Sequence, residues 1–178
     1  MKIIPSILLP LILLCSCKEK GTKQIDFCNM LKLDQSYVNT DVNDKEFKSD
    51  GIKRNDIFKS NFEELVKYFR SQGFPEIGPL KNVTGIDSCR NWAVKMTLFH
   101  VGQSQPHLLF QPHVIEVLTK EIKEGRLKSG KLSGAIWEGF GGFKFCISQK
   151  EIMHNALKNW GYEVSELPEI RFIDCEDK

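Results

Sequence analysis

The N-terminal segment constrains this chain most, because its pattern decides how much of the chain is left to fold. After Lys2, an apolar run extends from Ile3 to Cys15 and is interrupted only by two prolines and a serine. A membrane-spanning helix needs about 20 apolar residues, so this run is too short to cross a bilayer. One positive charge followed by a short apolar stretch is typical of a secretory signal peptide. We therefore expect residues 1–16 to be removed.

The end of this segment resembles the lipobox of bacterial lipoproteins. The motif Leu14-Cys15-Ser16-Cys17 places a small residue directly before a cysteine. In that family the cysteine, here Cys17, is acylated with palmitate-type chains and becomes the first residue of the mature protein. The resemblance thus implies a lipid bilayer as the first partner of the chain. Each buried methylene contributes about 0.8 kcal/mol, so two or three acyl chains make a durable anchor.

The residues after Cys17 imply where the anchor lies. Residues 17–24 are polar apart from the lipidated cysteine and form a short tether. Lys18 follows the cysteine instead of an aspartate, which by resemblance to lipoprotein sorting rules implies the outer membrane. The Lys18-Glu19 pair also resembles the charged start of surface-exported lipoproteins in Bacteroidota. We expect a protein of the bacterial cell envelope, on either the periplasmic or the surface face.

Residues 25–178 have the composition of one globular domain. The whole chain is 41% hydrophobic and 27% charged, with a net charge of +2, and removing residues 1–16 takes away one lysine and leaves +1. One domain is the normal expectation at this length. A nucleic-acid-binding protein needs a concentrated basic surface, and this balanced charge argues against that class of partner.

Four cysteines remain in the mature chain besides Cys17, and an exported protein meets an oxidising compartment. They are Cys28, Cys89, Cys146 and Cys175. Four cysteines allow three pairings. Two predicted strands lie at or near Cys146 and Cys175, so those two pair if the strands are neighbours, which leaves Cys28 with Cys89. A nucleophilic thiol beside a histidine (Cys89 with His100, or Cys146 with His154) is the alternative, but no nucleophile motif supports it.

Hydrophobic periodicity predicts a mostly helical α+β domain with four to five helices. Apolar spacing indicates helices over about 56–72, from Asp87 to Gly102, from Pro112 to Gly125, from Ser129 to Trp137 and from Ser148 to Gly161, with a further short helix near Phe27. Ser60 and Glu63 could form a capping box, and residues 34–50 are predicted to be a loop. Alternation at 143–147 and 170–173 predicts a small sheet of two or three strands near the C-terminus.

Residues 55–132 also resemble a bacterial domain family to which no activity is assigned. The shared features are Gly73-Phe74-Pro75 after a helix, a buried helix that ends in His100, and a helix that begins at Gln111. The Tyr-Gly-Thr-Gln-like segment with which that family ends is absent, and Gly141-Gly142-Phe143 stands there instead. The resemblance implies no activity, cofactor or partner.

Three histidines provide the strongest case for catalytic chemistry. His100, His107 and His113 lie within fourteen residues, and three imidazoles can hold zinc with a fourth position open for water. Their spacing matches no zinc signature, and Gly102 and Pro106 break the helix between them. His100 also shares a helical face with Cys89 and Ala93, which favours a hydrogen-bonded core residue. A zinc-dependent hydrolase is therefore the alternative function, with zinc as its cofactor.

The favoured function is non-catalytic binding at the cell envelope, without a cofactor. The segment between the two apolar helices is polar and accessible in character, and function concentrates on such loops. Its candidate binding residues are Gln103, Gln105, His107, Gln111 and His113. The three tryptophans, Trp92, Trp137 and Trp160, could line a pocket together with phenylalanines. Most of these aromatic residues lie on helical stripes, which favours the core instead. The ligand is either a protein or a small molecule, and an envelope-assembly component is a third class of function.

Overall fold

The structure is a computed structural model that describes residues 25–36, 47–77 and 85–175. The predicted signal peptide, Cys17 and the tether 17–24 lie outside these residues. Within the described residues, no helix combines the length and the hydrophobicity that crossing a bilayer requires.

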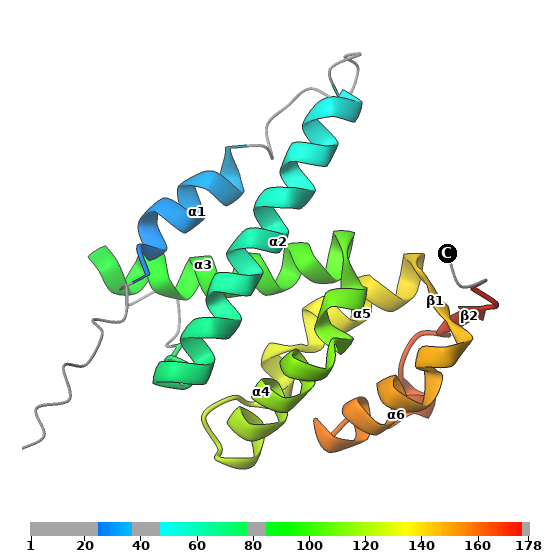
Figure 1. Ribbon diagram of the computed structural model, residues 1–178. Coiled ribbons are helices and arrows are strands. Elements are labelled where there is room, and N and C mark those ends of the chain that lie inside the picture. The colour runs from blue at the N-terminus through cyan, green and yellow to red at the C-terminus, as the bar shows by residue number, and fades with distance from the viewer. Residues whose placement is uncertain (1–24, 37–46, 78–84, 176–178) are drawn as a thin grey trace, which may run out of the picture.

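Three helices build the upper part of the molecule in Figure 1. They are α1 (Phe27–Gln35), α2 (Phe47–Gln72) and α3 (Gly85–Ser104). The Asp26 side chain caps α1 by accepting a hydrogen bond from the backbone N–H of Asn29 at 3.0 Å. α3 runs across the molecule and packs against α1 and α2 on one side and against α5 on the other.

Three helices, each shorter than α3, follow it and form the lower part of the molecule. A 3₁₀ turn (Pro106–Phe110) leads from α3 into α4 (Pro112–Lys123), and α5 (Ser133–Gly142) and α6 (Lys150–Asn159) complete the set. Phe110, Phe140, Phe145 and Trp160 bring their rings together in the core of this part. The indole N–H of Trp160 donates to the Thr119 hydroxyl at 3.0 Å, so its one polar atom is satisfied although the residue is fully buried.

The sheet is small and parallel. Strands β1 (Lys144–Cys146) and β2 (Arg171–Ile173) pair with Phe145 opposite Phe172, and α6 makes the crossover between them. The small sheet of two or three strands predicted near the C-terminus is confirmed, with two strands, as is the mostly helical character. The described residues hold six α-helices, slightly more than the four to five expected.

Both disulfides join segments that are far apart in the sequence. Cys28 pairs with Cys89, with 4.8 Å between their Cα atoms, and Cys146 pairs with Cys175 at 5.3 Å. The first bridge fastens α1 to α3, and the second lies beside the β1–β2 pair. The pairing expected from the neighbouring strands is confirmed. Because these four cysteines form two disulfides, neither Cys89 nor Cys146 has a free thiol that could act as a nucleophile.

α3 and α5 approach each other so closely that only glycine fits at the contact. A Cβ atom on Gly102 would lie 2.2 Å from the carbonyl oxygen of Ala135, and one on Gly139 would lie 2.6 Å from Cβ of Pro106. Gly102 continues α3, which ends at Ser104. The sequence prediction that this glycine ends the helix was wrong, because its role is to admit a neighbouring helix.

Two further predicted boundaries were wrong. Residues 47–50 belong to α2, which begins nine residues before the expected start at residue 56. Ser60 and Glu63 therefore lie inside α2 and cannot cap it. The segment from Ser129 to Lys131 is a 3₁₀ turn, and the helix predicted to start there begins at Ser133 and continues through Gly142.

Candidate functional site

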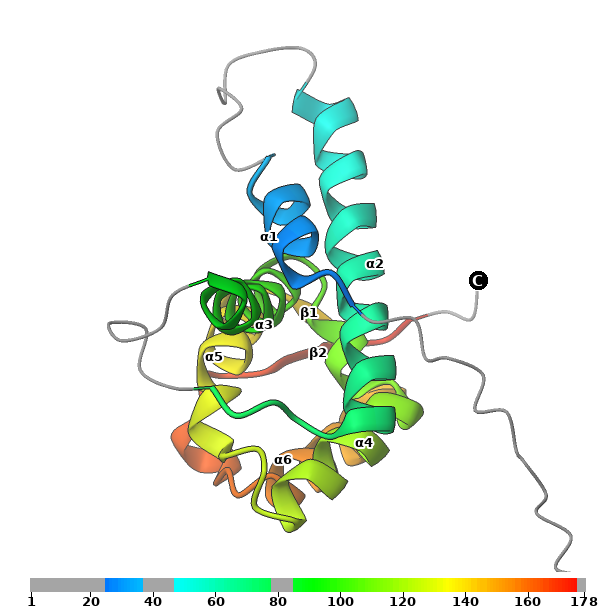
Figure 2. The same ribbon diagram turned by 90° about the vertical axis from the view of Figure 1, so that its left-hand side faces the viewer.

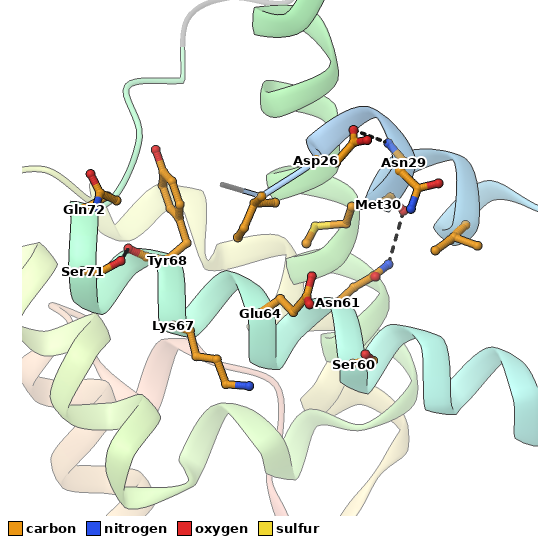
Figure 3. Close-up of a pocket in the computed structure, with 12 residues that line it drawn as sticks. Asp26, Asn29, Met30, Ser60, Asn61, Glu64, Lys67, Tyr68, Ser71 and Gln72 are labelled. Carbon is orange, nitrogen blue, oxygen red and sulfur yellow. Dashed lines mark hydrogen bonds between the residues drawn. The ribbon is translucent and has the colours of Figure 1, made fainter. Parts of the chain in front are cut away.

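A groove lies between α1 and α2. It is open to solvent and has a volume of about 1040 Å³. Figure 3 shows Met30 and Asn29 on α1 facing Asn61 and Glu64 on α2 across it. The groove begins at Ile25, the first described residue, and extends along α2 as far as Gln72.

The floor and the walls of the groove differ in polarity. Met30 and Asn61 are buried, and the Asn61 amide donates to the Met30 carbonyl oxygen at 3.3 Å, which joins the two helices. Tyr68 is half-buried, and its ring meets the edge of Phe27 with 5.3 Å between centroids. Exposed hydroxyl, amide and charged groups form the rim; these are Asp26, Asn29, Ser60, Glu64, Lys67, Ser71 and Gln72.

α1 is held rigidly enough to serve as one wall. The Cys28–Cys89 disulfide fastens its first turn to α3. At its other end, a carboxylate oxygen of Asp34 lies 2.9 Å from Nδ1 of His100 on α3. Figure 2 shows α1 above α3 and beside α2, so one short helix contacts both long ones. α1 is thus fixed to α3 near both of its ends, and the Asn61–Met30 hydrogen bond fixes its middle to α2. A wall held in this way gives a preformed groove, as is usual for ligand sites.

The Asp34–His100 pair is buried, with 1% and 6% of the two residues exposed. The His100 ring also stacks on Phe58 of α2, with 4.5 Å between centroids. Asp34 accepts a second hydrogen bond from the Gln35 amide at 2.8 Å. The pair and the stacked Phe58 ring link three helices inside the fold, so we assign His100 a structural role, as its helical face suggested.

The structure does not bring the three histidines of the zinc hypothesis together. His100 is buried against α1 and α2, whereas His107 in the 3₁₀ turn and His113 in α4 are exposed. Partial burial and the charge of Lys59 lower the pKa of His107. Among the described residues, no group of three or more His, Cys, Asp or Glu side chains is placed to hold a metal ion. The described residues therefore give the zinc hypothesis no support: His100 lies in α3, His107 in the 3₁₀ turn and His113 in α4.

The predicted binding loop, residues 103–113, is more deeply built into the fold than its composition indicates. Pro106, Leu108, Leu109 and Phe110 are all buried. The Gln105 amide donates to the Asn55 carbonyl oxygen at 2.7 Å, which ties this segment to α2. Gln103, His107 and His113 are exposed and Gln111 is half-buried. None of these polar residues lines the α1–α2 groove, and the binding-loop prediction stays a prediction.

Two of the three tryptophans are not in the core. Trp160 is fully buried, as expected, but Trp92 on α3 and Trp137 on α5 are 42% and 51% exposed. The prediction was wrong for Trp92 because α3 packs against α1, α2 and α5 but keeps one face exposed. It was wrong for Trp137 because this residue lies on the exposed face of α5, with Gly134, Glu138 and Gly141.

Sequence reasoning missed the α1–α2 groove. The apolar residues near Phe27 indicated a short helix, but local spacing does not say which helix it packs against. The two cysteines at 28 and 89 were the available signal, because their pairing places α1 beside α3. No protein-family model, curated protein or solved structure was found to match this chain.

Proposed function

We propose that the chain is a lipid-anchored lipoprotein of the bacterial cell envelope that acts as a non-catalytic binding module. Its binding site is the α1–α2 groove, and its ligand is an extended peptide segment of an envelope protein. The groove is the observation that carries this proposal. It is open at the surface. A disulfide and the buried Asp34–His100 contact fasten its α1 wall to α3, and the Asn61 amide joins α1 to α2.

The lining of the groove matches a peptide in chemistry. Amide side chains such as Asn29 and Gln72 offer both a donor and an acceptor, which is what a peptide backbone requires. Met30, Leu33 and Tyr68 offer apolar surface for side chains, and Leu33 is 41% exposed. The charged residues of the rim are Asp26, Glu64 and Lys67, two acidic and one basic, so the groove does not favour a strongly anionic ligand.

The expected anchor leads directly to this groove. The tether 17–24 ends at Ile25, which lines the groove and precedes the Asp26 cap of α1. Acylation at Cys17 would therefore hold the groove close to the bilayer, with the outer membrane as the membrane that the sorting resemblance implies. An extended partner protruding from the same envelope would then find the groove within reach.

Site-specific photocrosslinking in cells tests the binding site. A photoreactive residue at Ser60 or Lys67, on the rim of the groove, should give a discrete crosslinked product. The same residue at Lys131, which is exposed in the 3₁₀ turn before α5, is the matched control and should give none. Filling the groove with Ser60→Trp should abolish the product formed from Lys67. Equal crosslinking from all three positions would contradict the assignment of the groove.

Cell fractionation tests the anchor separately. Cys17→Ser removes the acylated thiol and should move the protein out of the membrane fraction. Retention of the Cys17→Ser variant in the membrane fraction would refute the anchor and leave the groove to be judged by its own experiment.

A further inference from the structure

We propose that a second surface of the protein, formed by Trp92, Met96 and Phe99 of α3 and Trp137 of α5, docks directly onto the lipid bilayer. We refer to these four residues as the tryptophan face. The proposal rests on the lipid anchor of the proposed function and adds to it: the anchor would hold the domain near the membrane, and the tryptophan face would fix its orientation there.

The spacing of the tryptophan face makes it continuous along α3. Trp92, Met96 and Phe99 are separated by four and three residues, so they form one stripe on the helix. Trp92 is 42% exposed, and Met96 and Phe99 are each half-buried. Figure 2 looks nearly along α3 and shows α1 above it, α2 to its right and α5 below it. Because Trp92, Met96 and Phe99 are less buried than most of their neighbours on α3, the stripe belongs to the side of the helix that these neighbours leave open.

α5 extends the stripe into a surface. A Cβ atom on Gly134 would lie 3.9 Å from Cδ2 of Phe99, so the two helices touch at the lower edge of the stripe. Trp137 follows Gly134 by three residues and lies on the same side of α5, with 51% of its surface exposed. Two exposed indoles thus flank a half-buried methionine and phenylalanine. An apolar surface of this kind in a soluble domain indicates an interaction site.

The chemistry of the face favours a lipid surface over a protein partner. Tryptophan is enriched at membrane–water interfaces because its ring is apolar and its N–H group is polar. Lys95 lies three residues after Trp92 and so adjoins the stripe, whereas Arg90 of the same helix pairs with Asp87 at 2.9 Å. Basic side chains beside apolar ones are attracted to anionic headgroups and can extend their charge away from the apolar zone. Glu138 follows Trp137 but points about 100° further round α5.

The tether of residues 17–24 is short and ends close to α3. The eight residues 17–24 can span at most about 29 Å. They end at Ile25, three residues before Cys28, whose Cα atom lies 4.8 Å from that of Cys89. Trp92 follows Cys89 by one turn of α3. A lipid on Cys17 would therefore keep the tryptophan face within reach of the bilayer, and it would hold that face there at a high local concentration.

Docking by this face would also leave the groove free. Cys28 faces α3, whereas Leu33, five residues later, lines the groove. Positions five residues apart point about 140° from each other around a helix. The two surfaces thus lie on different sides of α1, and the bilayer would cover one without closing the other.

Tryptophan fluorescence of the full lipidated protein tests the proposal. The chain has three tryptophans, and Trp160 is an internal control because it is fully buried and bonded to Thr119. The protein is reconstituted into vesicles of three parts phosphatidylethanolamine to one part phosphatidylglycerol, with or without bromine on the acyl chains. Bromine quenches only indoles that reach the acyl region. We expect brominated vesicles to remove most of the emission of Trp92 and Trp137, and to leave the emission of a Trp92→Phe, Trp137→Phe double variant unchanged.

Flotation and iodide quenching distinguish a failure of the lipid anchor from a failure of the tryptophan face. Flotation of the same vesicles reports the anchor: a protein that does not float refutes the lipoprotein proposal itself. A protein that floats but shows no quenching by bromine refutes the tryptophan face alone. Iodide in the aqueous phase then identifies the reason, because indoles that iodide quenches are free in solution. Indoles protected from both quenchers are covered by a second copy or by another protein, and that result also overturns lipid docking.

Discussion

Asp34 and His100 illustrate how single polar residues define the arrangement of the helices around the groove. Both are almost fully buried, they lie on different helices, and they contact each other at 2.9 Å. A buried polar group without a partner costs free energy. α1 and α3 must therefore pack so that the two side chains meet. His100 also stacks on Phe58, so the third helix is positioned by the same side chain.

Replacing His100 by alanine should therefore destabilise the fold. The variant loses the ring stacking and leaves the Asp34 carboxylate buried without its partner, and such losses cost about 3 kcal/mol. His113→Ala is the matched control, because His113 is exposed on α4 and its loss should change stability by less than about 0.5 kcal/mol. Chemical denaturation measures both. Equal stability of the two variants would show that the buried pair does not fasten α1.

Glu121 provides the second residue-scale contact, between α4 and the end of α2. It is 1% exposed and accepts hydrogen bonds from the Phe74 backbone N–H at 2.7 Å and from Nε and Nη2 of Arg126 at 2.6 and 2.7 Å. Arg126 also pairs with the more exposed Glu124. The hydrogen bonds from Arg126 are the main reason why the pKa of Glu121 lies below its ordinary value of 4.5.

This lowered pKa predicts a specific pH dependence. Because the pKa of Glu121 is lower in the folded state than in the unfolded state, its contribution to stability is complete above about pH 4.5 and is lost as the pH falls through the folded-state pKa. Glu121→Gln should cost about 2 kcal/mol at pH 7, and the difference from wild type should shrink in acid. Urea unfolding at several pH values measures it. Glu124→Gln is the control, and an unchanged difference for Glu121→Gln across the range would contradict the assignment.

At the scale of helices and strands, the contact between α3 and α5 depends on the absence of a side chain. Gly102→Ala places a Cβ atom 2.2 Å from a backbone oxygen, which cannot move away without shifting α5. We expect a loss of about 3 kcal/mol in the free energy of unfolding. Gly141→Ala on α5 is the matched control, since a Cβ there meets nothing within 4 Å and alanine favours a helix. Thermal unfolding that ranks Gly141→Ala below Gly102→Ala would contradict this packing.

The sequence predicted the existence of most helices and strands, but not all of their boundaries or packing partners. The stripe from Phe58 to Phe69 indicated α2, and the alternation around Phe145 and Phe172 indicated β1 and β2, because local periodicity reports directly on a buried face. The start of α2 at Phe47 was missed, since its first turns are polar and resemble a loop. The groove was missed because it depends on which helix α1 packs against. That choice is made by contacts such as Asp34–His100, which lie 66 residues apart in the sequence.

The same reasoning explains the two misplaced tryptophans. A helix as apolar as 92–101 is normally buried all round. Here α3 has neighbours on most sides but not on the flank that carries Trp92, so an apolar sequence was left with an exposed stripe. Whether a helix face is covered is a property of the assembled fold. Sequence periodicity identifies the face and cannot identify its neighbour.

The molecule as a whole is, on these proposals, a single domain with two binding surfaces, joined to a lipid anchor by one tether. The groove between α1 and α2 would bind a peptide, the tryptophan face would rest on the bilayer, and the first described residue, Ile25, lies at the edge of the groove. Two disulfides hold the groove wall and the C-terminal strand in place, as suits an oxidising compartment. Acylation of Cys17 is the claim on which this arrangement depends.

The intact mass of the protein purified from bacterial membranes tests that claim most directly. The account predicts a chain that begins at Cys17, carries the added mass of the acyl chains on that residue, and lacks four hydrogens because of its two disulfides. Fragmentation should place the whole lipid mass on the first residue. A chain that retains residues 1–16, or that begins elsewhere without added lipid, would contradict the anchor and the membrane orientation derived from it.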